Sequence, residues 1–212
     1  MPSHKNIVYP PPQEIRVRYI KLALFGCFIN FITRGVIAIY ETLGLVIALN
    51  FNWSNMQLAL LVSSSGLIGV FVLLNFNIFT SFLSDYDLML IGMIKMSLAC
   101  LILSFISDNF FFQMIQLCIS FFVMYSIAYP LGNTAALAMF SKIISSGPQG
   151  KMLGWFASAG SLARVIFPIM SGFLSNYYGE SSMFLIGFSL LVISIAGTAW
   201  FKADIIEMLN TE

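Results

Sequence analysis

Long apolar stretches separated by short polar ones dominate this chain. Six of them are predicted to be membrane spans: residues 19–50, 56–79, 88–106, 110–132 or somewhat beyond, 152–175 and 182–201. Each holds roughly 20 mainly apolar residues or more, enough for an α-helix to cross the hydrocarbon core of a bilayer. The apolar positions do not alternate with a period of two, which favours helices over a β-barrel. We therefore predict an all-α membrane protein with six transmembrane helices.

The polar connectors carry residues that end or cap helices. The segments NFNWSN, SDYDL, SDN, SSGPQGK and NYYGES interrupt the apolar runs with Asn, Asp, Ser, Gly or Pro. Before the first run, Pro10, Pro11 and Pro12 resist helix formation. The pattern predicts a cytosolic tail or linker at 1–18, a six-span unit at 19–202 and a cytosolic tail at 203–212.

Composition agrees with a lipid environment. Of the 212 residues, 59% are hydrophobic and only 9% are charged. A soluble domain cannot bury that much apolar surface, so the bilayer is the expected solvent. Cys27, Cys100 and Cys118 lie within apolar runs, which favours packed side chains over a disulfide framework or a metal site. We predict neither a cofactor nor a metal.

The flanking basic residues predict the orientation. Seven of them fall on one side of a six-span chain: Lys5, Arg16, Arg18, Lys21, Lys142, Lys151 and Lys202. By the positive-inside rule, both termini are expected in the cytosol. Asn52, in the sequon Asn-Trp-Ser, then lies in a loop on the opposite side, where glycosylation is permitted.

Besides Lys21 at the edge of the first span, four charged residues lie inside the spans, where a charge costs roughly 2.5–3.5 kcal/mol on insertion scales. In the first span Asn30, Arg34, Ile37 and Glu41 recur at helical spacing and share one stripe. Arg34 and Glu41 are about 10 Å apart along the axis, too far for a tight ion pair. Each is expected to face a cavity or another helix, where it either serves a solute or only ties helices together. Glu41 is also a candidate for proton coupling.

The other two charges are Lys95 and Arg164. Lys95 lies about two turns from the cytosolic end of its span and is expected to reach the interface rather than a solute. Arg164 shares a helix face with small residues, which leaves room for close helix approach or for a water-filled notch. Three cations against one acid favour an anionic solute.

The fourth span adds neutral polar residues. Gln113, Gln116 and Ser120 form one stripe, which either lines a cavity or pairs amides between helices. The later Pro130-Leu131-Gly132 invites a kink. The predicted substrate path thus comprises Asn30, Arg34, Glu41, Gln113, Gln116 and Arg164.

Other functional classes find little support. The stretch SSSG at 63–66 resembles an intramembrane serine protease only superficially, because the one histidine, His4, lies in the tail. The sequence has neither a phosphate-cradling glycine loop nor a basic patch for nucleic acid. A non-transporting membrane subunit or scaffold, from a truncated chain, stays an alternative.

Three stretches carry a resemblance to a known family. They are YET at 40–42, YPLGN with SKI between 129 and 143, and GPQGKMLGWFASAGSLARVIFP at 147–168. With six spans and cytosolic ends, the chain resembles the C-terminal half of a major facilitator superfamily (MFS) transporter. Within that superfamily it resembles a lysosomal branch that includes a protein altered in a neuronal ceroid lipofuscinosis. Plant vacuolar phosphate carriers with a soluble SPX domain share the Ala163-Arg164 step and are the nearest alternative.

The resemblance implies an endolysosomal membrane and a small solute, an anion or chloride, carried by alternating access or through a channel-like path. It implies that the first and fourth spans line that path, and that a second six-helix half is the partner, either a missing N-terminal half or a dimer partner. Two features depart from the pattern: the loop SDN is short, and SFLSDYDLML lacks the basic residues of the superfamily's gating motif.

Overall fold

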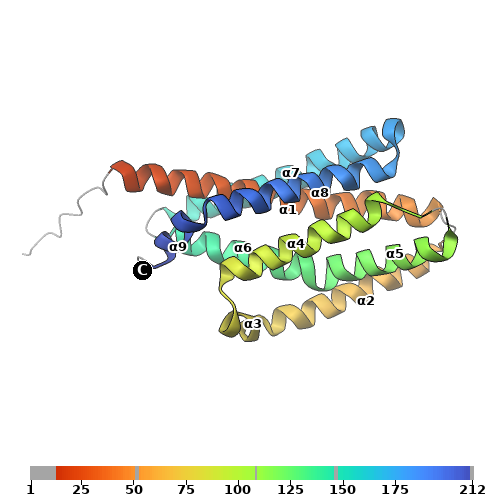
Figure 1. The fold of residues 1–212 in the computed structure, drawn as a ribbon, viewed down its shortest axis with the longest axis horizontal. Helices are drawn as coiled ribbons and strands as arrows, with labels where there is room; N and C mark the ends of the chain where they lie inside the picture. The colour runs from red at the N-terminus through yellow and green to blue at the C-terminus, as the bar shows by residue number, and fades with distance from the viewer. Residues whose placement is uncertain (1–12, 51–52, 108, 146–147, 211–212) are drawn as a thin grey trace, which may run out of the picture.

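The computed structural model describes residues 13–50, 53–107, 109–145 and 148–210, and every regular element in these ranges is helical (Figure 1). The elements are α1 (Gln13–Asn50), α2 (Asn55–Leu74), α3 (Phe76–Phe82), α4 (Asp85–Ser104), α5 (Phe110–Val123), the π-helical turn η1 (Met124–Ala128), α6 (Tyr129–Ile143), α7 (Gln149–Tyr178), α8 (Glu180–Trp200) and α9 (Lys202–Asn210). The predicted all-α fold class is confirmed.

Six helical segments of the described chain are long and apolar enough to cross a bilayer. They are Val17–Asn50, Asn55–Leu74, Asp85–Ser104, Phe111–Ile143, Gln149–Tyr178 and Glu180–Trp200. They match the six predicted runs, with ends that differ by a few residues in most cases. The fourth extends to Ile143, well past Gly132, and the second run is divided because α3 follows α2 after a break at Asn75.

Local capping explains where several helices begin. Ser54 and Gln57 form a capping box at the start of α2: the Ser54 hydroxyl accepts from the Gln57 N–H at 3.3 Å, and the Gln57 side chain accepts from the Ser54 N–H at 2.9 Å. Ser84 caps α4 by accepting from the Asp87 N–H at 3.2 Å. Between α7 and α8, Gly179 has φ 81°, a conformation that suits a residue without a Cβ. The polar connectors seen in the sequence are therefore true helix boundaries.

The irregularity predicted near Pro130 is the π-helical turn η1, which lies just before the proline. Pro130 has no N–H with which to continue the regular ladder. In the turn, the Tyr129 N–H donates to the Met124 carbonyl, five residues earlier. The fourth span therefore consists of α5 and α6 joined by η1.

Packing at small residues sets the spacing of the helices. The helix α1 packs most extensively against α7, and α4 lies between α8 and α6. At the crossing of α4 and α6, a Cβ added to Gly92 would lie 2.3 Å from the Gly132 Cα. Only glycine permits such close backbone approach. This contact holds α6 in place, and α6 carries Tyr129 and Leu137 of the site described below.

Polar contacts tie the helix ends together. The start of α1 and helix α9 lie at the same end of the bundle (Figure 1), where Arg18 pairs with Asp204 at 3.2 Å and with Glu207 at 2.5 Å. At the opposite end, Asn50 of α1 donates to the Glu180 carboxylate of α8 at 2.7 Å. The two described ends of the chain therefore meet on one side of the bundle, as an even number of spans requires.

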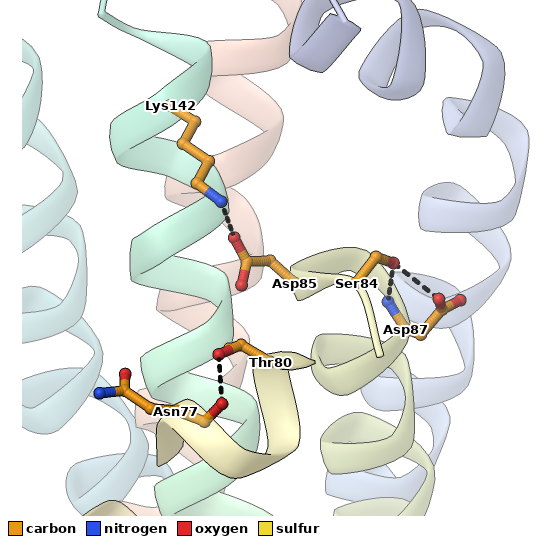
Figure 2. Close-up of polar contacts among 6 residues, drawn as sticks. All are labelled: Asn77, Thr80, Ser84, Asp85, Asp87 and Lys142. Carbon is orange, nitrogen blue, oxygen red and sulfur yellow. Dashed lines mark hydrogen bonds and ion pairs between the residues drawn. The ribbon is translucent and has the colours of Figure 1, made fainter. Parts of the chain in front are cut away.

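A further ion pair joins the end of α6 to the start of α4. The Lys142 ammonium, in the last turn of α6, lies 2.6 Å from the carboxylate of Asp85 in the first turn of α4. Figure 2 shows the two side chains pointing toward each other. The Asp85 side chain is only 8% exposed. Each charge lies at the helix end that the macrodipole favours. Lys142 thus supplies, from another helix, a cation that the connector before α4 lacks.

Candidate functional site

A pocket of about 380 Å³ lies between α1, α6 and α7. Its walls are formed by Asn30, Arg34, Leu137, Leu153, Phe156, Ala157, Gly160, Ser161 and Arg164. Three of the six residues predicted for the substrate path, Asn30, Arg34 and Arg164, are thereby brought together. The small residues Ala157, Gly160 and Ser161, on the Arg164 face of α7, line this pocket. A volume of this size suits a small solute.

Asn30 is fixed in the pocket wall by a contact between helices. It is 2% exposed, and its Nδ2 donates to the Phe156 carbonyl of α7 at 2.6 Å. Gly160 makes this possible, since a Cβ there would lie 2.8 Å from the Asn30 Nδ2 and 3.1 Å from the Arg34 Cγ. The Asn30 Oδ1 is buried without a hydrogen-bond partner within the described chain. One amide thus joins α1 to α7 beside the two guanidinium groups.

Arg34 extends from α1 toward the fourth span. The carbon of its guanidinium group is 5.7 Å from the centre of the Tyr129 ring. Such a cation–π contact orients a guanidinium group and leaves its N–H donors free to bind an anion. Tyr129 is the first residue of α6, so the π-helical turn and the Gly92–Gly132 contact together determine where this ring lies.

Glu41 has its partner on another helix rather than in its own. Its Oε1 lies 3.7 Å from the Nη2 of Arg164, and both side chains are 47% exposed. The pair joins α1 to α7 about two turns beyond Arg34. A single contact of this length, between half-exposed groups, is weak in water. Arg164 therefore contacts both the pocket and the acid outside it.

The two glutamines lie elsewhere. The Gln116 side chain holds the connector between α4 and α5 by two hydrogen bonds to its backbone. Its Nε2 donates to the Phe105 carbonyl at 2.9 Å, and its Oε1 accepts from the Ser107 N–H at 3.0 Å. Gln113 is buried on α5, and neither residue lines the pocket. Spacing within one helix placed them on a common face but could not tell which neighbours that face meets.

The remaining predicted features fall outside the pocket or outside the described chain. Lys95 is half-buried on α4, which contributes nothing to the pocket wall. Asn52 lies outside the described residues, as does the part of the tail at 1–12. A second hollow of about 470 Å³ lies at the turn from α7 to α8, and Glu180, an acidic residue in its described lining, already accepts from Asn50.

Comparison with known proteins gives this arrangement a family. The sequence profile of the Major Facilitator Superfamily matches residues 23–210, which include all six spans apart from the first residues of α1. The chain belongs to the Major Facilitator Superfamily. A stretch of 73 residues is 30% identical to major facilitator superfamily domain-containing protein 8 of Xenopus laevis, covering 34% of this chain and 14% of that relative. The matched part is thus a small share of that protein.

Membership in the superfamily gives the broad function, because its members are transporters of solutes across membranes and are generally not enzymes. The sequence stretches that resemble the superfamily have different structural roles in this chain. The segment at 147–168 supplies one wall of the pocket, including Gly160 and Arg164. In the segment at 40–42, Glu41 meets Arg164.

Tyr40, the first residue of the segment at 40–42, stabilises the packing of the helices. It is buried, and its hydroxyl lies 2.7 Å from the Ser120 hydroxyl, which donates to the Ala99 carbonyl at 2.9 Å. These contacts link α1, α5 and α4 in the core of the bundle. Ser120, which shared the stripe of Gln113 and Gln116 in the sequence, therefore belongs to the core.

Proposed function

We propose that this chain forms the C-terminal six-helix half of a transporter for a small anionic solute. The observation that supports this most directly is the pair of guanidinium groups of Arg34 and Arg164 in one pocket, whose described lining contains no acidic side chain. Placing a cation at bilayer depth is costly, so such residues usually serve a solute path or a buried pair. Two of them lining one small cavity, whose other described polar lining residues Asn30 and Ser161 are uncharged, favours an anion path.

The partner in this proposal is a second six-helix half, either an N-terminal half or a second copy. Arg164 and Glu41 are each 47% exposed on this chain. Half-exposed charges within a span cannot face lipid tails, so this face requires cover by protein or water. The face that carries the pocket would then lie between the two halves, as in transporters built from repeats.

Glu41 is proposed as the residue that couples transport to protons. Its carboxylate forms an ion pair with Arg164 at 3.7 Å, directly beside the pocket. Protonation would release Arg164 and change the charge beside the pocket. If Glu41→Gln leaves the pH dependence of flux unchanged, this assignment fails.

For the location, we propose the endolysosomal membrane with both termini in the cytosol. The support is the resemblance of the segment at 147–168 to the lysosomal branch and the side shared by the flanking basic residues. A tagged chain should colocalise with a lysosomal marker, and tags at either terminus should be accessible from the cytosol. Glycosylation of Asn52 would place that loop in the lumen, and loss of a glycosidase-sensitive mobility shift in Asn52→Gln would test it.

Flux in liposomes tests the transport proposal. The chain, reconstituted alone and together with any second half, should take up labelled lactate in a saturable way. Arg34→Gln and Arg164→Gln should each reduce uptake at least 10-fold, as expected when a charged hydrogen bond of about 1.5–3 kcal/mol is lost. Lys95→Gln is the matched control, since it removes a span cation that does not line the pocket.

Other outcomes would favour other functions. Chloride current without saturable uptake would identify an anion channel, and uptake of phosphate alone would favour a carrier of the vacuolar phosphate type. A folded chain with no flux in either preparation would favour a non-transporting subunit. Equal losses in Lys95→Gln and the pocket variants would refute the pocket as the path.

A further inference from the structure

Glu41 stands next to the proposed anion site without belonging to it. Its carboxylate is 3.7 Å from the Arg164 Nη2, whereas the pocket lining includes Arg164 but not Glu41. The Arg164 guanidinium group can therefore pair either with the Glu41 carboxylate of α1 or with an anion that enters the pocket. On the proposed function, these two anions compete for one cation.

The geometry of the pair favours displacement over permanent pairing. The contact is single and long, compared with the roughly 2.7–2.9 Å of a charge-assisted hydrogen bond. Both side chains are half-exposed, so neither is enclosed by the packing of α1 against α7. A guanidinium group has five N–H donors, enough to turn toward an oxyanion in the pocket while it gives up Glu41.

The charges around the pocket also limit the charge of the solute. Arg34 and Arg164 contribute two positive charges and Glu41 contributes one negative charge, so the cluster carries a net charge of +1. A singly charged anion balances this cluster. A doubly charged anion would leave an excess negative charge in a region where uncompensated charge is expensive.

We propose that Glu41 is a built-in competitor of the solute for Arg164 and that it makes the site selective for monovalent anions. This inference rests on the proposed function and names the class of its substrate. Glu41 acts on specificity through Arg164 and does not itself bind the solute. Its removal should therefore improve anion binding, whereas removal of a residue that holds the solute would weaken it.

Equilibrium binding to the full chain in lipid nanodiscs tests this idea with matched anions. Lactate and malate share a 2-hydroxycarboxylate group and differ by one carboxylate; nitrate and sulfate form an inorganic pair with the same difference in charge. Wild-type protein should bind lactate at least as tightly as malate, and nitrate at least as tightly as sulfate. Clear preference for the divalent member of both pairs would overturn the proposal, without need of any variant.

The variant Glu41→Gln removes the charge and keeps the shape. Exposed ion pairs of this kind are worth 0.2–1 kcal/mol, so lactate should bind about 1.5- to 5-fold more tightly. Malate should gain more, because it is repelled by Glu41 through two charges, and the malate-to-lactate affinity ratio should rise at least about 2-fold. Glu41→Asp keeps the charge and should leave that ratio at its wild-type value.

Glu180→Gln is the control, because Glu180 is another acid whose side-chain partner lies on a different helix, but it lies at the turn from α7 to α8, away from the pocket. It should change neither affinity. If Glu41→Gln weakens lactate binding or leaves the ratio unchanged while Arg34→Gln and Arg164→Gln still reduce binding, this inference is wrong and the proposed function stands. If none of the four anions binds to the wild-type chain, the proposed anion site itself fails.

Discussion

The contact between Gly92 of α4 and Gly132 of α6 yields a sharp test of the packing that positions the site. In Gly92→Ala, the added Cβ would lie 2.3 Å from the Gly132 Cα, 2.7 Å from the Gly132 nitrogen and 3.0 Å from the Ala128 carbonyl oxygen. All three atoms belong to the backbone, so no side-chain rotation can relieve the contact. The two helices must move apart.

The cost can be worked out from that distance. Carbon atoms are comfortable at about 3.5–4.0 Å, so the helices must separate by roughly 1.2 Å at the crossing. Overpacking of this kind costs about 1–3 kcal/mol, and rigid backbone neighbours place it near the upper end. The gain in helix propensity from glycine to alanine offsets about 1 kcal/mol. We expect a net loss of about 2 kcal/mol in the free energy of unfolding.

Thermal unfolding followed by circular dichroism in detergent micelles measures this loss. For a chain of 150–250 residues, 2 kcal/mol corresponds to a decrease in Tm of about 4–8 °C. Gly66→Ala in α2 is the control, since nothing lies within 4 Å of the added Cβ, and it should keep or raise the Tm. A Gly92→Ala protein that melts at or above the Gly66→Ala protein would refute the close approach of α4 and α6.

Three further predictions concern the site and its supports. Gly160→Ala should weaken lactate binding several-fold, because the new Cβ meets the pocket wall at 2.8 Å, whereas Gly154→Ala on the same helix points into open space and should not; equal effects would contradict this. Tyr40→Phe should lower the free energy of unfolding by about 1 kcal/mol through loss of one buried hydrogen bond, measured by the same melts, and an unchanged Tm would exclude that bond. Lys142→Gln should lower the Tm because it leaves the buried Asp85 carboxylate without its cation, and the double variant with Asp85→Asn should recover most of the loss; failure to recover would show that the two groups are not coupled.

The number of spans and most of their limits follow from local sequence alone. A run of apolar residues of bilayer length forms a helix in lipid because every backbone group must be satisfied within the segment. Ser54, Ser84 and Gly179 end or begin helices through contacts within a few residues, so their connectors were visible in the pattern. The end of the fourth span was less visible, because α6 continues past Gly132 among small and polar residues.

The candidate site was only partly predictable, because spacing along a helix defines a face but not its neighbour. The stripe of Asn30, Arg34 and Glu41 and the small-residue face of Arg164 were both readable from helical periodicity. That the two faces meet, with Asn30 bonded to the Phe156 carbonyl and Glu41 beside Arg164, depends on how α1 packs on α7. Gln116 shows that helical spacing can also mislead. Its polar stripe predicted either a cavity lining or amide pairing between helices, but its amide bonds to the backbone of the connector between α4 and α5.

The sequence by itself therefore determined that this protein lies in a lipid bilayer, that it has six spans and which residues bring charge into the membrane. It could do so because hydrophobicity, span length and helical period are local properties. Only the tertiary structure decided which charges share a pocket and which meet an opposite charge, because these outcomes depend on the packing of helices far apart in the chain. Arg34 and Glu41 illustrate the division. One helix presents both on a single stripe, but α6 and α7 give Arg34 an aromatic ring and Glu41 a guanidinium group.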